Sequence, residues 1–431
     1  MNTSLLYMDV YHHFEQLILG GQLPPGAKLP SLRKCCWELH VSRTTVEAAY
    51  LQLAADGYII SRPQSGYFVT EIAEVIRQGQ KMQKKRPEKA PIRYDFASSG
   101  VDRQSFRFDL WQRYLKSALR QNERMLTYGE PQGESDLRET LAAYIRTQRN
   151  IYCGADQILI GAGVQSLLQL LCPMLKDRRT VSFPTPSFTQ GIAVFTDYGF
   201  KVHYRDRDCS IIYVSPAHMT RWGEIMPVKR RMELIRYSEQ HGSIVIEDDY
   251  ENEFVYLQKP TPSLYSLSGS ENVVYLGTFS RLLLPSIRIS FMILPPSLLS
   301  LYQERASHYN QTASKAEQIA LCQFIRDGHM ASQIRRLNRL YGQKLKLLAD
   351  EVDRVFGPGC QIRYGAAGIT LALTVPCLLT EEELRARMNS SGIRFQILSL
   401  SEGSLTLVLS CSSMDTSVYP EALRLLKELL I

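Results

Sequence analysis

Apolar residues among the first seventy positions recur at helical spacing in three successive segments. The first runs from Tyr7 to Leu19 and ends at a Leu-Pro-Pro-Gly turn. The second starts after Ser31 and the third after Ser42, and both serines are favourable N-caps. The third segment is predicted to bury Val46, Ala49, Tyr50 and Leu53 and to expose Arg43, Thr44 and Thr45 in its first turn.

A hairpin is expected directly after these helices. Two short β-prone runs, Tyr58–Ser61 and Tyr67–Thr70, flank the sequence Arg-Pro-Gln-Ser-Gly, which is typical of a turn. Three helices followed by a hairpin predict a winged helix-turn-helix, which we assign to residues 1–70.

From about Tyr94 onward the pattern changes to short apolar runs that alternate with helical segments. Such runs are typical of strands buried on both faces, so this part is expected to be α/β, with a mainly parallel sheet and helices on both faces. The runs are Gln157–Ile160, Ile211–Val214, Ser243–Ile246 and Val273–Leu276. Residues 94–431 would form this large domain, with a small α+β subdomain over about 332–431.

Composition adds little, but the location of charge is informative. The chain has 431 residues, is 45% apolar and 22% charged, and carries a formal charge of +7. Residues 1–70 balance five basic against five acidic side chains, whereas residues 71–93 carry seven basic against three acidic ones. The excess of basic side chains at 71–93 therefore favours a solvated linker in that segment. Net charge alone does not establish DNA binding.

Several protein classes are disfavoured. The chain begins without a basic leader, and no apolar run reaches membrane-spanning length. The nine cysteines are scattered without a C-x-x-C pair, so neither a zinc site nor a disulfide framework is indicated, and no metal ligands are assigned. A reducing cytoplasm is the expected location.

The start of the third helix has the chemistry to read DNA. In a helix-turn-helix this helix lies in the major groove, where Arg43 can bond guanine while Thr44 and Thr45 reach base edges or phosphate. Backbone N–H groups after Ser42 suit a phosphate, and Arg33 would contact the DNA backbone. Taken alone, these residues could equally be an ordinary solvent-facing helix start.

Five sequence blocks resolve that ambiguity by their order. Together they resemble the winged domain of GntR-family regulators, which implies that Ser65 and Gly66 at the hairpin tip also meet a double-stranded DNA operator. One departure is His40, where the family usually has glycine in the turn. The blocks are Leu29–Arg33, Val41–Val46, Tyr50–Leu53, Asp56–Tyr58 and Ser65–Val69.

Three stretches of the large domain suggest a site that could hold a phosphate group. The turn Gly161–Ser166 follows a strand and opens a helix, so its N–H groups can hold a phosphate. Asp248 and Tyr250 follow a buried strand, and Gly277–Arg281 with Pro285–Arg288 adds hydroxyls and a guanidinium.

Residues 94–431 resemble fold-type I aminotransferases, and the whole chain resembles the MocR subfamily of GntR regulators. This resemblance implies that Asp248 meets the pyridine nitrogen of pyridoxal phosphate, Tyr250 its 3-oxygen and Phe188 its ring. His218 would lie beside the ring, and Tyr128 would contribute across a homodimer interface. The phosphate would be held by Gly163, Val164, Thr278, Ser280 and Arg288.

The main departure from the family is Arg281, which stands where the Schiff-base lysine is expected. A guanidinium stays protonated and is not an amine nucleophile, so the cofactor or a related vitamer would bind noncovalently, if at all. No catalytic residue is assigned and enzyme activity is not expected. The segment between Gly199 and Ile211 also looks shortened.

The sequence leads to three hypotheses about the function. The first is a dimeric transcription regulator whose large domain senses a small-molecule effector. The second is a working pyridoxal-phosphate enzyme, which Arg281 opposes. The third is a ligand-free dimerisation scaffold that sets the spacing of two winged domains.

Overall fold

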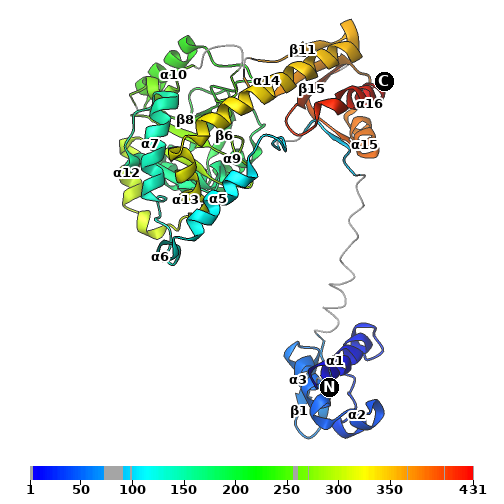
Figure 1. Ribbon diagram of the computed structural model, residues 1–431. Coiled ribbons are helices and arrows are strands. Elements are labelled where there is room, and N and C mark those ends of the chain that lie inside the picture. Colours follow the sequence, from blue (N-terminus) through cyan, green and yellow to red (C-terminus); the bar gives the residue numbers. More distant parts are fainter. Residues whose placement is uncertain are drawn as a thin grey trace. The chain divides into compact units, whose positions relative to one another are not determined.

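The computed structural model of the protein describes residues 3–71, 91–97, 100–255, 261–269, 271–365, 367–401 and 403–430. The chain divides into two compact units, Met1–Lys89 and Ala90–Ile431 (Figure 1). Most of the predicted linker, 71–93, lies outside the described residues.

The first unit has the predicted three helices and hairpin. Its elements are α1 (Thr3–Leu19), α2 (Leu32–Leu39), α3 (Arg43–Ala55), β1 (Ile59–Arg62) and β2 (Gly66–Val69). Ser31 and Ser42 cap α2 and α3, since their hydroxyls accept hydrogen bonds from the Lys34 and Thr45 amides. His40, between these helices, adopts a left-handed conformation with φ 54°.

The core of this unit lies between α1, α3 and the hairpin, and it includes the predicted Val46, Ala49, Tyr50 and Leu53. Thr45 corrects the sequence analysis, because it is only 7% exposed. Its hydroxyl lies 2.7 Å from that of Ser42, so this threonine belongs to the helix cap and not to the exposed first turn. The first strand of the hairpin lies one residue later than predicted and the second one residue earlier, with Ile59 opposite Val69.

A seven-stranded sheet forms the centre of the second unit, in the order β4-β10-β9-β8-β7-β5-β6. All neighbouring strands are parallel except β10, which is antiparallel to both β4 and β9. This confirms the mainly parallel sheet. The strands are β4 (Ile158–Gly161), β5 (Thr180–Phe183), β6 (Lys201–Tyr204), β7 (Ile211–Val214), β8 (Ile244–Asp248), β9 (Val273–Thr278) and β10 (Ser290–Ile293).

Helices cover both faces of this sheet. Successive strand residues point to opposite faces, so they enter two different cores. Leu159, Ile246 and Val274 pack in one core, and Ile160, Val245 and Val273 in the other. The first core is covered by α8 (Val164–Leu171), η2 (Cys172–Arg178), α9 (Thr189–Asp197) and α12 (Pro296–Gln303). The second is covered by α5 (Phe108–Leu119), α7 (Ser135–Arg149), α10 (Val228–His241), α11 (Leu264–Leu267) and α13 (Lys315–Arg326).

The C-terminal part begins with the long helix α14 (His329–Phe356) and contains a second, antiparallel sheet in the order β11-β12-β15-β14. Its other elements are β11 (Gln361–Arg363), β12 (Thr370–Pro376), α15 (Glu381–Ser391), β14 (Gln396–Ser401), β15 (Ser404–Ser410) and α16 (Tyr419–Leu430). Short connecting helices are α6 (Asn122–Met125), η1 (Ala155–Gln157), η3 (Ala306–His308), η4 (Gly357–Gly359) and η5 (Thr416–Val418).

The start of the second unit is paired with this C-terminal part. Strand β3 (Tyr94–Asp95) lies parallel to β13 (Ile393–Arg394). Phe96 is 1% exposed, and its carbonyl accepts a 2.8 Å hydrogen bond from the Ser410 amide. Among the described residues no helix has the length and apolarity needed to cross a membrane.

Candidate functional site

The first unit presents two groups of predicted DNA contacts. Arg43 and Thr44 are exposed at the start of α3, and Arg33 is exposed on α2. Ser65 and Gly66 are exposed at the hairpin tip, where Gly66 has φ 106°. The guanidinium of Arg62 lies 4.6 Å from the Phe68 ring centroid, which places a cation beside this tip. Both groups can therefore donate hydrogen bonds to phosphates or base edges.

In the second unit, most of the predicted ligand residues follow strands that point in one direction. Strands β4, β5, β7, β8 and β9 are mutually parallel within the sheet, so their carboxyl ends share one edge. In open α/β sheets this edge is where ligands bind. The residues that lie at or after these strand ends are Gly163, Val164, Phe188, His218, Asp248, Tyr250, Thr278, Ser280 and Arg281.

One end of this edge can hold an anion. Gly163 is buried, has φ 100° and precedes α8, whose first N–H groups are directed toward the edge. A Cβ atom at Gly163 would lie 2.2 Å from Nη2 of Arg288, so only glycine lets this guanidinium approach the turn. The hydroxyl of Ser290 donates to that of Thr278 at 2.8 Å, and Ser280 lies beside it, 3.3 Å from Thr278 Oγ1. Backbone donors, hydroxyls and a cation are thus combined.

Asp248 is a buried carboxyl with an unused acceptor. Tyr213 donates to Oδ2 of Asp248 at 2.6 Å, whereas Oδ1 is buried without a hydrogen-bond partner among the described residues. Burial raises the pKa of Asp248 to about 7, and the neighbouring charge of Asp249 acts in the same direction. Because an unsatisfied buried acceptor is costly, this oxygen suits a ligand that supplies a donor.

Arg281 and His218 meet at a second buried carboxylate, Glu251. Oε1 of Glu251 lies 3.0 Å from Nε of Arg281, and its Oε2 lies 3.9 Å from Nε2 of His218. The rings of His218 and Tyr250 are stacked, with centroids 4.7 Å apart. Burial lowers the pKa of His218 and raises that of Tyr250, which favours the neutral forms of both. Within the described part of the chain, Arg281 Nη1 and His218 Nε2 have no hydrogen-bond partner.

The two predicted aromatic contacts have different surroundings. Phe188 lies against Tyr213, with ring centroids 5.4 Å apart, and Gly191 leaves room for its ring. Tyr128 is 99% exposed in the loop after α6, so within its own chain its side chain lies outside this cluster. Lys315 holds the loop, since its ammonium donates to the carbonyls of Arg124, Thr127 and Tyr128.

Sequence reasoning did not find Tyr213 or Glu251. A tyrosine hydroxyl within the otherwise apolar run Ile211–Val214 needs a hydrogen-bond partner once it is buried. That requirement was the signal in the sequence that could have revealed the contact of Tyr213. Glu251 belongs to the acidic run after β8. Its contact with Arg281 depends on a left-handed backbone conformation, φ 55°, that could not be predicted from the sequence.

Comparison with known proteins bears on both units. Residues 6–69 match the model of bacterial regulatory proteins of the gntR family, and residues 105–388 match aminotransferase class I and II. An uncharacterized HTH-type transcriptional regulator of Bacillus subtilis, YdeL, is 34% identical over 92% of this chain and 89% of its own length. The probable rhizopine catabolism regulatory protein MocR of Rhizobium meliloti is 28% identical over 91% of this chain and 86% of its own.

Among solved structures, α-aminoadipate aminotransferase LysN of Thermus thermophilus has a TM-score of 0.65 and 21% identity, covering 78% of this chain and 91% of its own. This likeness confirms the aminotransferase fold of the second unit. The chain belongs to the family of HTH-type transcriptional regulators that join a gntR-type winged domain to an aminotransferase class I and II domain.

Proposed function

We propose that this protein is a homodimeric transcription regulator that binds an operator through its winged unit and a pyridoxal-phosphate-type vitamer, noncovalently, through its aminotransferase-like unit. The regulator names of its relatives support the first part. The buried, unpartnered Oδ1 of Asp248 carries the second part, because it provides an acceptor where the family would place the cofactor's ring nitrogen.

The residues at this edge of the sheet fit the groups of this ligand. The turn at Gly163 and Val164, with Thr278, Ser280 and Arg288, would hold the phosphate. Asp248 would meet the ring nitrogen, Tyr250 the 3-oxygen, and Phe188 and His218 the ring. When bound, pyridoxal phosphate would supply an aldehyde able to react with amines. LysN, which shares the fold, was solved with N-(5'-phosphopyridoxyl)-L-leucine.

Arg281 is the reason for proposing a receptor and not an enzyme. We place it at the position of the Schiff-base lysine, where its guanidinium is bound by Glu251 and cannot act as a nucleophile. Lys315 cannot replace it, because its ammonium is committed to three backbone carbonyls. Lys259 lies outside the described residues.

The proposed dimer gives Tyr128 a role. Its loop is held in place by Lys315 yet leaves the side chain almost fully exposed, as expected for a residue that a second copy would cover. The ligand-free scaffold remains the second candidate, and the unpartnered polar atoms of Asp248, His218 and Arg281 argue against it.

A titration separates these functions. Adding pyridoxal phosphate to the purified full chain should release or absorb heat as the ligand saturates one site per chain, and borohydride should fix none of it to the protein. Asp248→Ala should weaken this binding. Covalent fixation on the native chain would favour the enzyme, whereas no heat with pyridoxal phosphate, pyridoxamine phosphate or pyridoxine would favour the scaffold.

DNA recognition predicts a difference between two arginines. Arg43→Ala should lose roughly 1–3 kcal/mol of discrimination between operator and altered sites, because a guanidinium pair to guanine is removed. Arg33→Ala should weaken binding to all sequences by a similar factor and reduce its salt dependence, since a phosphate contact carries no sequence information. Fluorescence anisotropy with operator and scrambled duplexes measures both effects. Equal losses on every duplex for Arg43→Ala would contradict its base-reading role.

A further inference from the structure

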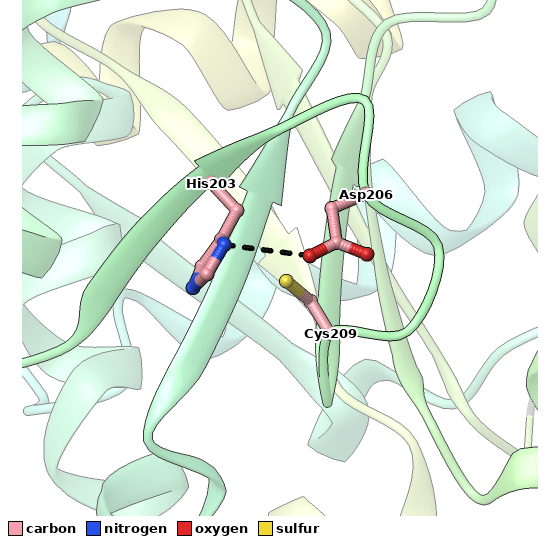
Figure 2. Close-up of side chains that lie close together, drawn as sticks. All are labelled: His203, Asp206 and Cys209. Atoms are coloured by element: carbon pink, nitrogen blue, oxygen red, sulfur yellow. Dashed lines mark ion pairs between the residues drawn. The ribbon is translucent and has the colours of Figure 1, made fainter.

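The short connection between β6 and β7 brings together three side chains with metal-binding donors. His203 lies in β6, Asp206 in the connection and Cys209 just before β7 (Figure 2). Their donor atoms all lie within 4.8 Å of one another. In the described part of the chain no other group of at least three His, Cys, Asp or Glu donors lies close enough to hold a metal ion.

The course of the chain explains this convergence. Strands β6 and β7 flank β5, and all three are parallel, so the chain must cross back over β5 in residues 205–210. Parallel strands usually need a crossover of a dozen residues or more. Here Arg205 turns with φ 54°, and the Asp206 amide donates to the Ser182 hydroxyl at 3.0 Å. The compact return therefore places the connection beside His203.

The separation of the donors is close to that of zinc ligands. Nδ1 of His203 and Oδ2 of Asp206 are 3.4 Å apart. With bonds of about 2.0–2.3 Å, two ligands of a tetrahedral zinc ion lie about 3.3–3.7 Å apart. The other carboxylate oxygen, Oδ1, accepts a 3.0 Å hydrogen bond from the Asp208 amide. This bond fixes the orientation of the Asp206 carboxylate, as hydrogen bonds to metal ligands commonly do. Sγ of Cys209 lies within 4.8 Å of both the His203 and Asp206 donors, so the sulfur would have to move closer to complete three bonds.

Charge and access fit the same ion. A neutral imidazole, a carboxylate and a thiolate together carry two negative charges, which balance one divalent cation. Cys209 is 2% exposed, whereas the side chains of His203 and Asp206 are 44% and 37% exposed, so an ion can enter from their side. Three protein ligands leave a fourth position for water.

We propose that His203, Asp206 and Cys209 bind one divalent transition-metal ion of the zinc class, which clips the β6–β7 crossover to the edge of the sheet. On binding, sulfur forms a bond to the ion and its proton passes to solvent, with no change in oxidation state. The site is independent of the proposed vitamer, because Cys209 precedes β7 whereas the ligand residue His218 follows it.

Cobalt provides a direct readout. The full chain, without a polyhistidine tag and freed of metal by a chelator under reducing conditions, should bind one equivalent of Co²⁺. Visible d–d bands and a thiolate-to-cobalt charge-transfer band are expected, and Zn²⁺ should abolish both. His203→Ala and Asp206→Asn should each weaken binding at least about tenfold. Cys209→Ser should remove the charge-transfer band, whereas Cys360→Ser, a partly exposed cysteine outside the cluster, should leave it unchanged.

The two exposed variants keep the test decisive if Cys209→Ser fails to fold, because His203 and Asp206 contribute little to the core. Zn²⁺ should also raise the melting temperature of the native chain and of Cys360→Ser, but not of Asp206→Asn. The proposal is overturned if Co²⁺ gives no thiolate band, or if the band survives in folded Cys209→Ser. It is also overturned if His203→Ala and Asp206→Asn bind Co²⁺ as tightly as the native chain does.

Discussion

The double variant Arg281→Lys with Glu251→Gln is expected to bind pyridoxal phosphate covalently, in a form that borohydride makes permanent. The native chain should show no such attachment. A lysine alone would lie beside the Glu251 carboxylate, now 3.0 Å from Nε of Arg281, and a neighbouring negative charge raises the pKa of an ammonium. Removing that charge should increase the fraction of neutral amine, which is the form that attacks an aldehyde.

The single variants serve as controls for this prediction. Arg281→Lys should attach the vitamer more slowly at neutral pH than the double variant, and Glu251→Gln should attach none. Mass spectrometry after borohydride reduction measures the fraction modified and the residue that carries it. If the double variant binds the vitamer tightly yet is never modified, Arg281 does not occupy the reactive position.

Arg149→Ala should be among the most destabilising single changes in the second unit. The guanidinium lies 2.6 Å from Oδ2 of Asp249, whose side chain is fully buried, and Tyr275 donates to the same oxygen. Removing one partner of a buried ion pair costs about 3–5 kcal/mol. The loss should be larger at higher pH, because an unpaired buried carboxyl has a raised pKa and is stable in the fold only while protonated.

Arg354→Ala is the matched control, since this arginine is 58% exposed and pairs with Glu351 one helical turn away. It should change the free energy of unfolding by less than about 1 kcal/mol. Urea unfolding followed by circular dichroism at pH 6 and pH 8 compares the two variants. Similar midpoints for both would show that the Asp249 pair does not stabilise the end of β8.

The sequence predicted the parts of the fold that depend on local pattern. Apolar periodicity located α3 and the buried strands β7 to β9, and the serines before α2 and α3 cap them as expected. Alternation along these strands sends residues into two cores, which is the physical basis for helices on both faces. The gntR and aminotransferase matches confirm the two domain types inferred from ordered motifs.

Features set by tertiary contacts escaped prediction. Thr45 was expected to be exposed beside Thr44 in the first turn of α3. Its side chain is buried instead, with its hydroxyl 2.7 Å from that of the capping Ser42. Glu251, Tyr213 and the cluster at His203 lie close to their partners only through the sheet or through left-handed turns. Spacing along the chain does not carry that information.

The pairing of β3 with β13 has a mechanical consequence. Backbone hydrogen bonds from Arg93 and Phe96 attach the segment that leads in from the winged unit to Gly392 and Arg394, and Arg93 also pairs with Glu421. Residues 93–96 are thus fixed to the C-terminal layer and not to the sheet whose edge holds Asp248. A ligand that moved this layer relative to that edge would therefore shift residues 93–96 together with it.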